Sequence, residues 1–187
     1  MSMQQQSTTL SPIEAGATIQ PQDIKLNYVI GDDGRLASFG FTVLGQPAVK
    51  KNNQKVTFRG GRSRKYNTPA YNRWLKLAND QVELAISVFQ ILACREWKTI
   101  DFPFNLRARF FVRTFGTVDL SALYEGIQDV MKDRGMILDD NAWLLVSHDG
   151  SGVAKDAYNP RIELLLTRVE HAEWRGEPNP RYNGGAG

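Results

Sequence analysis

A long stretch of helical periodicity constrains the fold of this chain more than any other feature. Thr68 and Pro69 mark its start, because a threonine side chain caps the first turn of a helix and proline fits the first helical position. Apolar residues then recur at helical spacing: Tyr71, Trp74, Leu75, Ala78, Val82, Ala85, Ile86, Phe89 and Leu92. The pattern predicts a helix from Pro69 to about Arg95, which must bury its apolar stripe against other elements.

β-rich segments before this helix supply part of that partner surface. Ile24–Ile30 and Leu36–Leu44 flank the turn signal Gly31-Asp32-Asp33-Gly34 and predict a hairpin. Val56–Phe58 is predicted as a further short strand, with Gly60-Gly61 as its turn.

The segment Phe104–Arg113 alternates between two kinds of residue and predicts a half-buried strand. Apolar residues fall on one side: Leu106, Ala108, Phe110 and Val112. Arginines fall on the other side: Arg107, Arg109 and Arg113.

A second, shorter helix is predicted from Leu120 to Met131, with Asp119 as its cap and Gly135 as its end signal. The last predicted extended segments are Met136–Leu138, Ala142–Ser147 and Arg161–Val169. The resulting order ββαβαββ predicts an α/β (α+β) fold, in which a single compact domain has a mixed β-sheet packed by two main helices.

Composition sets the boundaries of that domain and excludes some classes of protein. Residues 1–22 are rich in Gln, Ser and Thr and predict a disordered tail, and residues 171–187 are rich in Gly, Pro and Asn and predict a flexible one. The folded domain is therefore expected over residues 23–170.

No apolar run approaches the roughly 20 residues that span a bilayer, so no membrane partner is expected. Cys94 is the single cysteine, which excludes an intrachain disulfide and favours a cytoplasmic location.

Positive charge is concentrated in one segment of the chain. Seven basic residues and no acidic residue lie between positions 50 and 65: Lys50, Lys51, Lys55, Arg59, Arg62, Arg64 and Lys65. The whole chain carries a net charge of +3, so the remainder carries 3 − 7 = −4. Such a segment suits a polyanion such as DNA, and the alternative is an ordinary solvated basic loop.

Carboxylates around the second helix are the candidates for chemistry. Asp119 comes directly before the helix, and Asp139-Asp140 follow it. Oxygen ligands of this kind hold Mg²⁺, which leaves coordination positions for water and phosphate oxygens. The alternative is structural, with Asp119 as a helix cap and Asp139-Asp140 as a turn. If the pair is extended, its side chains point to opposite sides, so only one of them joins Asp119.

Several of these segments together resemble the RusA-like Holliday junction resolvases, which are small endodeoxyribonucleases common in phages and prophages. The resemblance covers roughly Val43 to Val169. It rests on these features: the basic, Asn-containing loop Lys50-Lys51-Asn52-Asn53, the helix after it, the arginine-bearing strand, the DLxxL segment at Asp119, the helical Asp129, the segment Leu138-Asp139-Asp140-Asn141, the stretch Ser147–Ser151 and the strand at Arg161-Ile162-Glu163. It implies a RusA-like homodimer that resolves four-way DNA junctions by paired symmetric nicks, in recombination, repair or phage DNA processing, with Mg²⁺ or Mn²⁺ held by aspartates.

The resemblance also assigns roles to particular residues. Asp119 matches the first aspartate of the family and Asp140 the last. The middle aspartate of the family falls on Ser121, the asparagine after it on Ala122, and the catalytic lysine on Glu125.

Two alternatives follow from these departures. In the first, Glu125 leans back by one turn over Ser121 and replaces the missing carboxylate, so that Asp119, Ser121, Glu125 and Asp140 surround the metal and a basic residue of the Lys50-Lys51 loop supplies positive charge. In the second, the chain has lost cleavage and remains a junction-binding or branched-DNA-binding protein on the same fold.

Both alternatives share the same expected DNA-binding residues. These are Lys50, Lys51, Asn52, Lys55, Arg59, Arg62, Arg64, Lys65, Arg107, Arg109 and Arg113.

Overall fold

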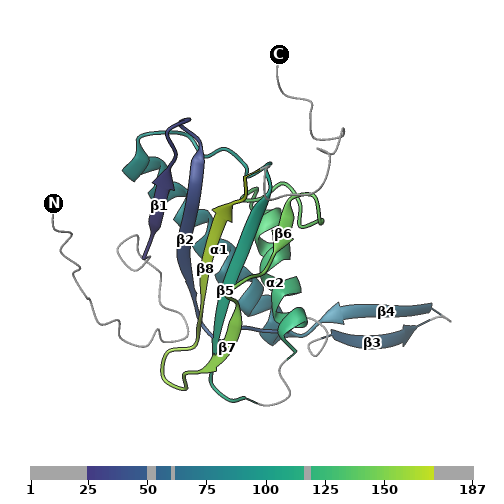
Figure 1. Cartoon of the computed structure of the whole chain (residues 1–187). Coiled ribbons are helices and arrows are strands. Elements are labelled where there is room, and N and C mark those ends of the chain that lie inside the picture. The colour runs from purple at the N-terminus through teal and green to yellow at the C-terminus, as the bar shows by residue number, and fades with distance from the viewer. Residues whose placement is uncertain (1–24, 50–53, 60–61, 116–118, 171–187) are drawn as a thin grey trace.

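Six strands form one mixed sheet, and a separate pair of strands forms a ribbon that projects from it (Figure 1). The computed structural model describes residues 25–49, 54–59, 62–115 and 119–170. The elements in chain order are β1 (Asn27–Ile30), β2 (Leu36–Leu44), β3 (Gln54–Arg59), β4 (Arg62–Asn67), α1 (Pro69–Ala93), β5 (Phe104–Val112), α2 (Leu120–Asp133), β6 (Leu145–Ser147), β7 (Gly152–Lys155) and β8 (Arg161–Arg168).

The main sheet has the strand order β1-β2-β8-β5-β6, and β7 also pairs with β5. Strands β1, β2, β8 and β5 are joined by antiparallel pairing. Strands β6 and β7 both run parallel to β5 and occupy successive parts of its edge, with Phe104 opposite Leu145 and Arg109 opposite Gly152. Helix α2 is therefore the crossover between the parallel strands β5 and β6.

Both helices cover the same face of this sheet, and no helix in the described part of the chain covers the other face, which we call the open face (Figure 1). On the covered face, the Phe39 ring of β2 contacts the Phe89 ring of α1 with centroids 5.7 Å apart, and the Phe110 ring of β5 contacts the Tyr124 ring of α2 at 5.4 Å. Arg107 and Arg109 of β5 alternate with the buried residues and are exposed on the open face. The alternation predicted for β5 is therefore confirmed.

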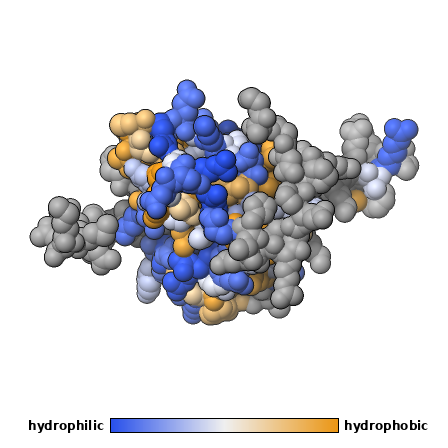
Figure 2. All heavy atoms as spheres, turned by 45° about the horizontal axis from the view of Figure 1, so that its top comes forward, coloured by the Kyte–Doolittle hydropathy of each residue, from blue (hydrophilic) through white to orange (hydrophobic). Residues whose placement is uncertain are grey.

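One face of the molecule shows both polar and apolar residues (Figure 2). Figure 2 shows hydrophilic residues over much of the visible coloured surface, with apolar residues in separate patches between them. Neither helix in the described part of the chain is long and apolar enough to cross a membrane.

The structure confirms both predicted helices and a mixed sheet. The Thr68 hydroxyl accepts a hydrogen bond from the Tyr71 backbone N–H at 3.3 Å, as expected for the cap of α1. Cys94 ends α1 in a left-handed conformation, one residue before the predicted end. Asp119 caps α2, and Gly135 adopts a φ of +65° directly after the last turn, where glycine carries no steric penalty.

The predicted strands need correction in three places. The short strand expected at Val56–Phe58 extends over Gln54–Arg59 and pairs with β4, which was not predicted because its sequence, RSRKYN, has no apolar alternation. The expected turn Gly60-Gly61 and the expected tails 1–22 and 171–187 lie outside the described residues. Strand β7 was also not predicted from the sequence.

The third correction concerns the segments before β6. Only Leu145–Ser147 of the predicted strand 142–147 is extended, because residues 142–144 form a turn. Within Met136–Leu138, Ile137 makes a single parallel bridge with Ile100.

Gln81 connects α1 to the end of β2 in the core. This side chain is fully buried, its Oε1 accepts from Leu44 N at 2.7 Å, and its Nε2 donates to Leu44 O at 3.0 Å.

We expect Gln81→Met, which keeps the side-chain length, to lower the free energy of unfolding by about 2–4 kcal/mol, because two buried backbone groups lose their partners. Urea denaturation checks this, with Gln90→Met at an exposed position of the same helix as the control. A change below about 0.5 kcal/mol in Gln81→Met would contradict it.

Candidate functional site

The N-terminal end of α2 holds two of the candidate residues, Asp119 and Ser121. The Asp119 carboxylate oxygen Oδ1 accepts from the Ser121 backbone N–H at 3.0 Å and from the Ser121 hydroxyl at 2.6 Å. This is the geometry of a helix cap, in which a carboxylate also interacts favourably with the positive end of the helix dipole. The structure thus brings Asp119 and Ser121 together as a cap.

The C-terminal end of α2 holds a cluster of two carboxylates and one ammonium group. Lys132 Nζ lies 2.8 Å from Asp140 Oδ1 and 3.8 Å from Asp129 Oδ1. All three side chains are about one third exposed. The hydrogen bond to Asp140 is the main reason that the pKa of Lys132 is raised. We call Asp129, Lys132 and Asp140 the carboxylate–lysine cluster.

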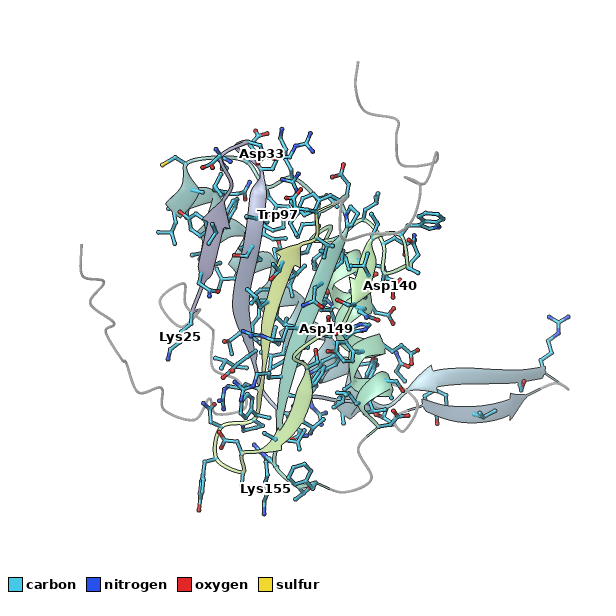
Figure 3. All side chains as sticks on the ribbon, viewed as in Figure 1. Lys25, Asp33, Trp97, Asp140, Asp149 and Lys155 are labelled. Carbon is cyan, nitrogen blue, oxygen red and sulfur yellow. The ribbon has the colours of Figure 1, made fainter. Side chains whose placement is uncertain are left out.

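The two carboxylates of the Asp139-Asp140 pair have different partners. Asp139 accepts from the Asn141 side-chain amide at 2.7 Å and from the Asp140 backbone N–H at 2.8 Å. These hydrogen bonds lower the pKa of Asp139, with the Asn141 amide contributing most. Asp139 therefore stabilises the turn, and Asp140 belongs to the cluster with Lys132 (Figure 3).

Asp119 and Asp140 lie at opposite ends of α2. Lys132, the partner of Asp140, lies thirteen positions after Asp119, which corresponds to a rise of about 20 Å along the helix axis. Because Mg²⁺ ligands lie about 2.1 Å from the ion, these two carboxylates do not meet at one ion within a single chain. The expected grouping of Asp119 with Asp140 around one ion therefore needs correction for the isolated chain.

Glu125 lies on the exposed surface of α2 between these two ends. It precedes Asp129 by four residues and therefore lies on the same side of the helix. In the described part of the chain, no three His, Cys, Asp or Glu side chains are grouped closely enough to hold a metal ion.

The middle of α2 contacts the loop that follows β6. The Gln128 amide nitrogen lies 2.9 Å from His148 Nε2, and the Tyr124 and His148 rings have centroids 4.1 Å apart. Asn105 fixes the same loop, because its Oδ1 accepts from the Ser147 hydroxyl at 2.7 Å and from the Asp149 backbone N–H at 2.9 Å. Neither contact was expected from the sequence.

His148 gives the site a predicted pH dependence. Burial is the main cause that lowers the pKa of His148 from its usual 6.5, and the Gln128 amide, which only donates, favours an unprotonated Nε2. The unfolded chain therefore binds the proton at higher pH than the folded chain does, so stability falls as the pH drops below about 6.5.

We expect the free energy of unfolding to decrease between about pH 7 and pH 5.5, and His148→Gln to reduce that decrease. Urea denaturation at several pH values measures it. The other histidine, His171, lies outside the described residues, and His171→Gln serves as the control. An unchanged pH profile in His148→Gln would contradict the expectation.

The three candidate arginines belong to the end and the open face of β5. Arg107 lies against Gly150, where an added Cβ would be 2.8 Å from Arg107 Cδ. Arg109 lies 5.5 Å from the centre of the Phe111 ring, and the Arg113 backbone N–H donates to Gln46 Oε1 at 2.9 Å. Because α2 covers the opposite face, the sheet separates Arg107 and Arg109 from the carboxylate–lysine cluster.

The candidate DNA-binding residues of the basic segment lie on the projecting ribbon or outside the described residues. Lys55 and Arg59 belong to β3, and Arg62, Arg64 and Lys65 belong to β4. Lys50, Lys51 and Asn52 lie outside the described residues.

The sequence contained a partial signal for the cluster. Asp129 and Lys132 have the i, i+3 spacing of an ion pair on one helix, and Lys132 lies in the last turn, where a cation is favourable. Asp140 joins them through the turn after the helix, which spacing alone does not predict. Comparison of the chain with protein-family models and with curated proteins finds no match.

Proposed function

We propose that this chain is a metal-dependent endonuclease that acts on branched DNA and nicks four-way junctions in the manner of the RusA-like resolvases. The observation that carries the proposal is the carboxylate–lysine cluster, in which the Lys132 ammonium group lies 2.8 Å from Asp140 Oδ1 and 3.8 Å from Asp129 Oδ1. Carboxylates that can hold a divalent ion, with a cation beside them, are groups that promote phosphodiester hydrolysis.

The donor set of the cluster fits Mg²⁺ or Mn²⁺. Asp129 and Asp140 offer carboxylate oxygens only, and hard divalent ions prefer oxygen ligands. These two residues would hold the ion. A bound ion supplies Lewis-acid stabilisation of a phosphoryl oxygen and lowers the pKa of a bound water.

Lys132 has two roles in this proposal. Its ammonium group lies within 4 Å of both the Asp129 and the Asp140 carboxylates and offsets the repulsion between their negative charges. It also positions Asp140 through their 2.8 Å hydrogen bond. With a phosphodiester bound beside the cluster, the same ammonium group would stabilise the negative charge that develops on the phosphoryl oxygens.

The basic ribbon supports DNA as the substrate. Strands β3 and β4 carry five basic residues and no acidic one, and they project from the body of the domain (Figure 1). A phosphate backbone neutralises such a concentration of positive charge without regard to sequence. Paired nicks in opposing strands require two active sites, which the expected homodimer would supply.

A second candidate function is branched-DNA binding without cleavage. It is favoured by the separation of Asp119 from Asp140 along α2 and by the serine and glutamate at positions 121 and 125. In this case the Asp129–Lys132–Asp140 contacts only stabilise the end of the helix.

Incubation of the purified chain with a four-way junction and with linear duplex, each with Mg²⁺, Mn²⁺ or a chelator, tests the proposal. Junction nicking that needs the ion supports the nuclease. Selective retention of the junction in a gel without nicking in any ion identifies the second candidate. Failure to bind the junction contradicts both.

A further inference from the structure

The β3–β4 ribbon is a separate two-stranded sheet that projects beyond the main sheet (Figure 1). Its antiparallel register runs without a break from the pair Gln54–Asn67 to the pair Arg59–Arg62. Val56 and Tyr66 are 49% and 45% exposed, although both are large and apolar or aromatic. An isolated two-stranded hairpin is marginally stable in water, so a ribbon of this kind gains stability from a surface that covers it.

The register distributes positive charge unequally over the two faces of the ribbon. Cross-strand partners share a face, and successive pairs alternate between faces. One face holds the pairs Lys55–Tyr66, Thr57–Arg64 and Arg59–Arg62, and the other holds Gln54–Asn67, Val56–Lys65 and Phe58–Ser63. The first, which we call the cationic face, has four of the five basic positions of the ribbon.

The dimensions of the ribbon match one groove of duplex DNA. Six residues per strand give a length of about 20 Å, and the two strands lie about 4.8 Å apart. The major groove, which is about 12 Å wide, admits a two-stranded ribbon. Arginine is also the side chain that most often contacts guanine O6 and N7 at the floor of the major groove.

We infer that the β3–β4 ribbon inserts its cationic face into the major groove of a duplex arm. The inference rests on the proposed function only in taking DNA as the substrate, and it adds the groove, the face and the residues. The register positions of Lys55, Arg59, Arg62 and Arg64 then belong to the face toward the DNA, and the register position of Lys65 belongs to the opposite face.

Two lysines of the ribbon provide a matched test. Lys55 and Lys65 occupy adjacent pairs of the register on opposite faces, and each loses one charge on substitution by glutamine. We expect Lys55→Gln and Arg64→Gln each to weaken four-way junction binding about tenfold, and Lys65→Gln to weaken it less than about threefold. Binding is measured by fluorescence anisotropy at one salt concentration, and circular dichroism checks that each variant is folded.

Protection of guanine N7 from dimethyl sulfate identifies the groove, since N7 lies in the major groove. Wild-type protein and Lys65→Gln are expected to protect guanines in the arms, and Arg64→Gln to lose that protection. Equal effects of Lys55→Gln and Lys65→Gln, or junction binding without N7 protection, would overturn the inference and leave the proposed function standing. If the wild-type chain binds no junction, the proposed function itself fails.

Discussion

Replacing Asp140 with asparagine is expected to reduce metal-dependent nicking of a four-way junction more than about a hundredfold. The substitution removes a charged oxygen ligand while preserving the size of the side chain. It also deprives Lys132 of the ionic partner that lies 2.8 Å from its Nζ. Junction binding is expected to stay within about threefold of wild type, because the basic ribbon is separate from this cluster.

Asp133→Asn is the matched control for this variant. Asp133 is the last residue of α2 and is exposed, and it is not one of the three cluster residues. Its substitution is expected to leave nicking within about twofold of wild type. Full activity in Asp140→Asn would contradict the placement of the metal ion at the C-terminal end of α2.

Asp119→Asn distinguishes two arrangements of the active site. Asparagine is as good a helix cap as aspartate, so this variant is expected to fold and to retain nicking. If it is inactive, the ion takes Asp119 from one copy of the chain and Asp140 from another, because they lie at opposite ends of α2. A mixture of Asp119→Asn and Asp140→Asn chains would then recover activity, since a mixed dimer contains one intact site.

Phe39→Ala is expected to have the largest effect on stability, lowering the free energy of unfolding by about 3–5 kcal/mol. The Phe39 side chain is fully buried and contacts the rings of Phe41, Phe89 and Trp97, with centroids 4.8 to 5.7 Å apart. Its loss opens a cavity between β2 and α1 and removes three aromatic contacts at once.

Urea denaturation followed by circular dichroism measures the effect of Phe39→Ala. Phe115→Ala provides a matched control, because Phe115 is 54% exposed, and its substitution is expected to change stability by less than about 0.5 kcal/mol. A loss below about 1 kcal/mol in Phe39→Ala would contradict the described packing of β2 against α1.

Local signals account for the parts of the fold that the sequence predicted well. Thr68 and Asp119 cap their helices through hydrogen bonds to backbone groups two or three residues away, so these helix starts are readable from a few residues. The alternation along β5 is similarly local. By contrast, β7 forms by parallel pairing with β5, which is more than forty positions earlier in the chain, and β4 forms by pairing with β3 despite its polar sequence.

The features of the candidate site also differ in how far the sequence alone predicts them. The distance between Asp119 and Lys132 follows from the predicted helix itself, because its rise keeps two residues at its ends about 20 Å apart. The contact between Lys132 and Asp140 depends on the conformation of the intervening turn, and the contact between Gln128 and His148 joins residues twenty positions apart. Neither has a local signal in the sequence.

The most direct test of the proposed function is to map the cleavage of an immobile four-way junction whose four strands are labelled in turn. With Mg²⁺ or Mn²⁺, the wild-type chain is expected to nick two opposing strands at symmetric positions and to leave linear duplex of the same sequence intact. Junction binding with all four strands uncut in either ion would contradict the nuclease and identify a protein that acts by binding alone.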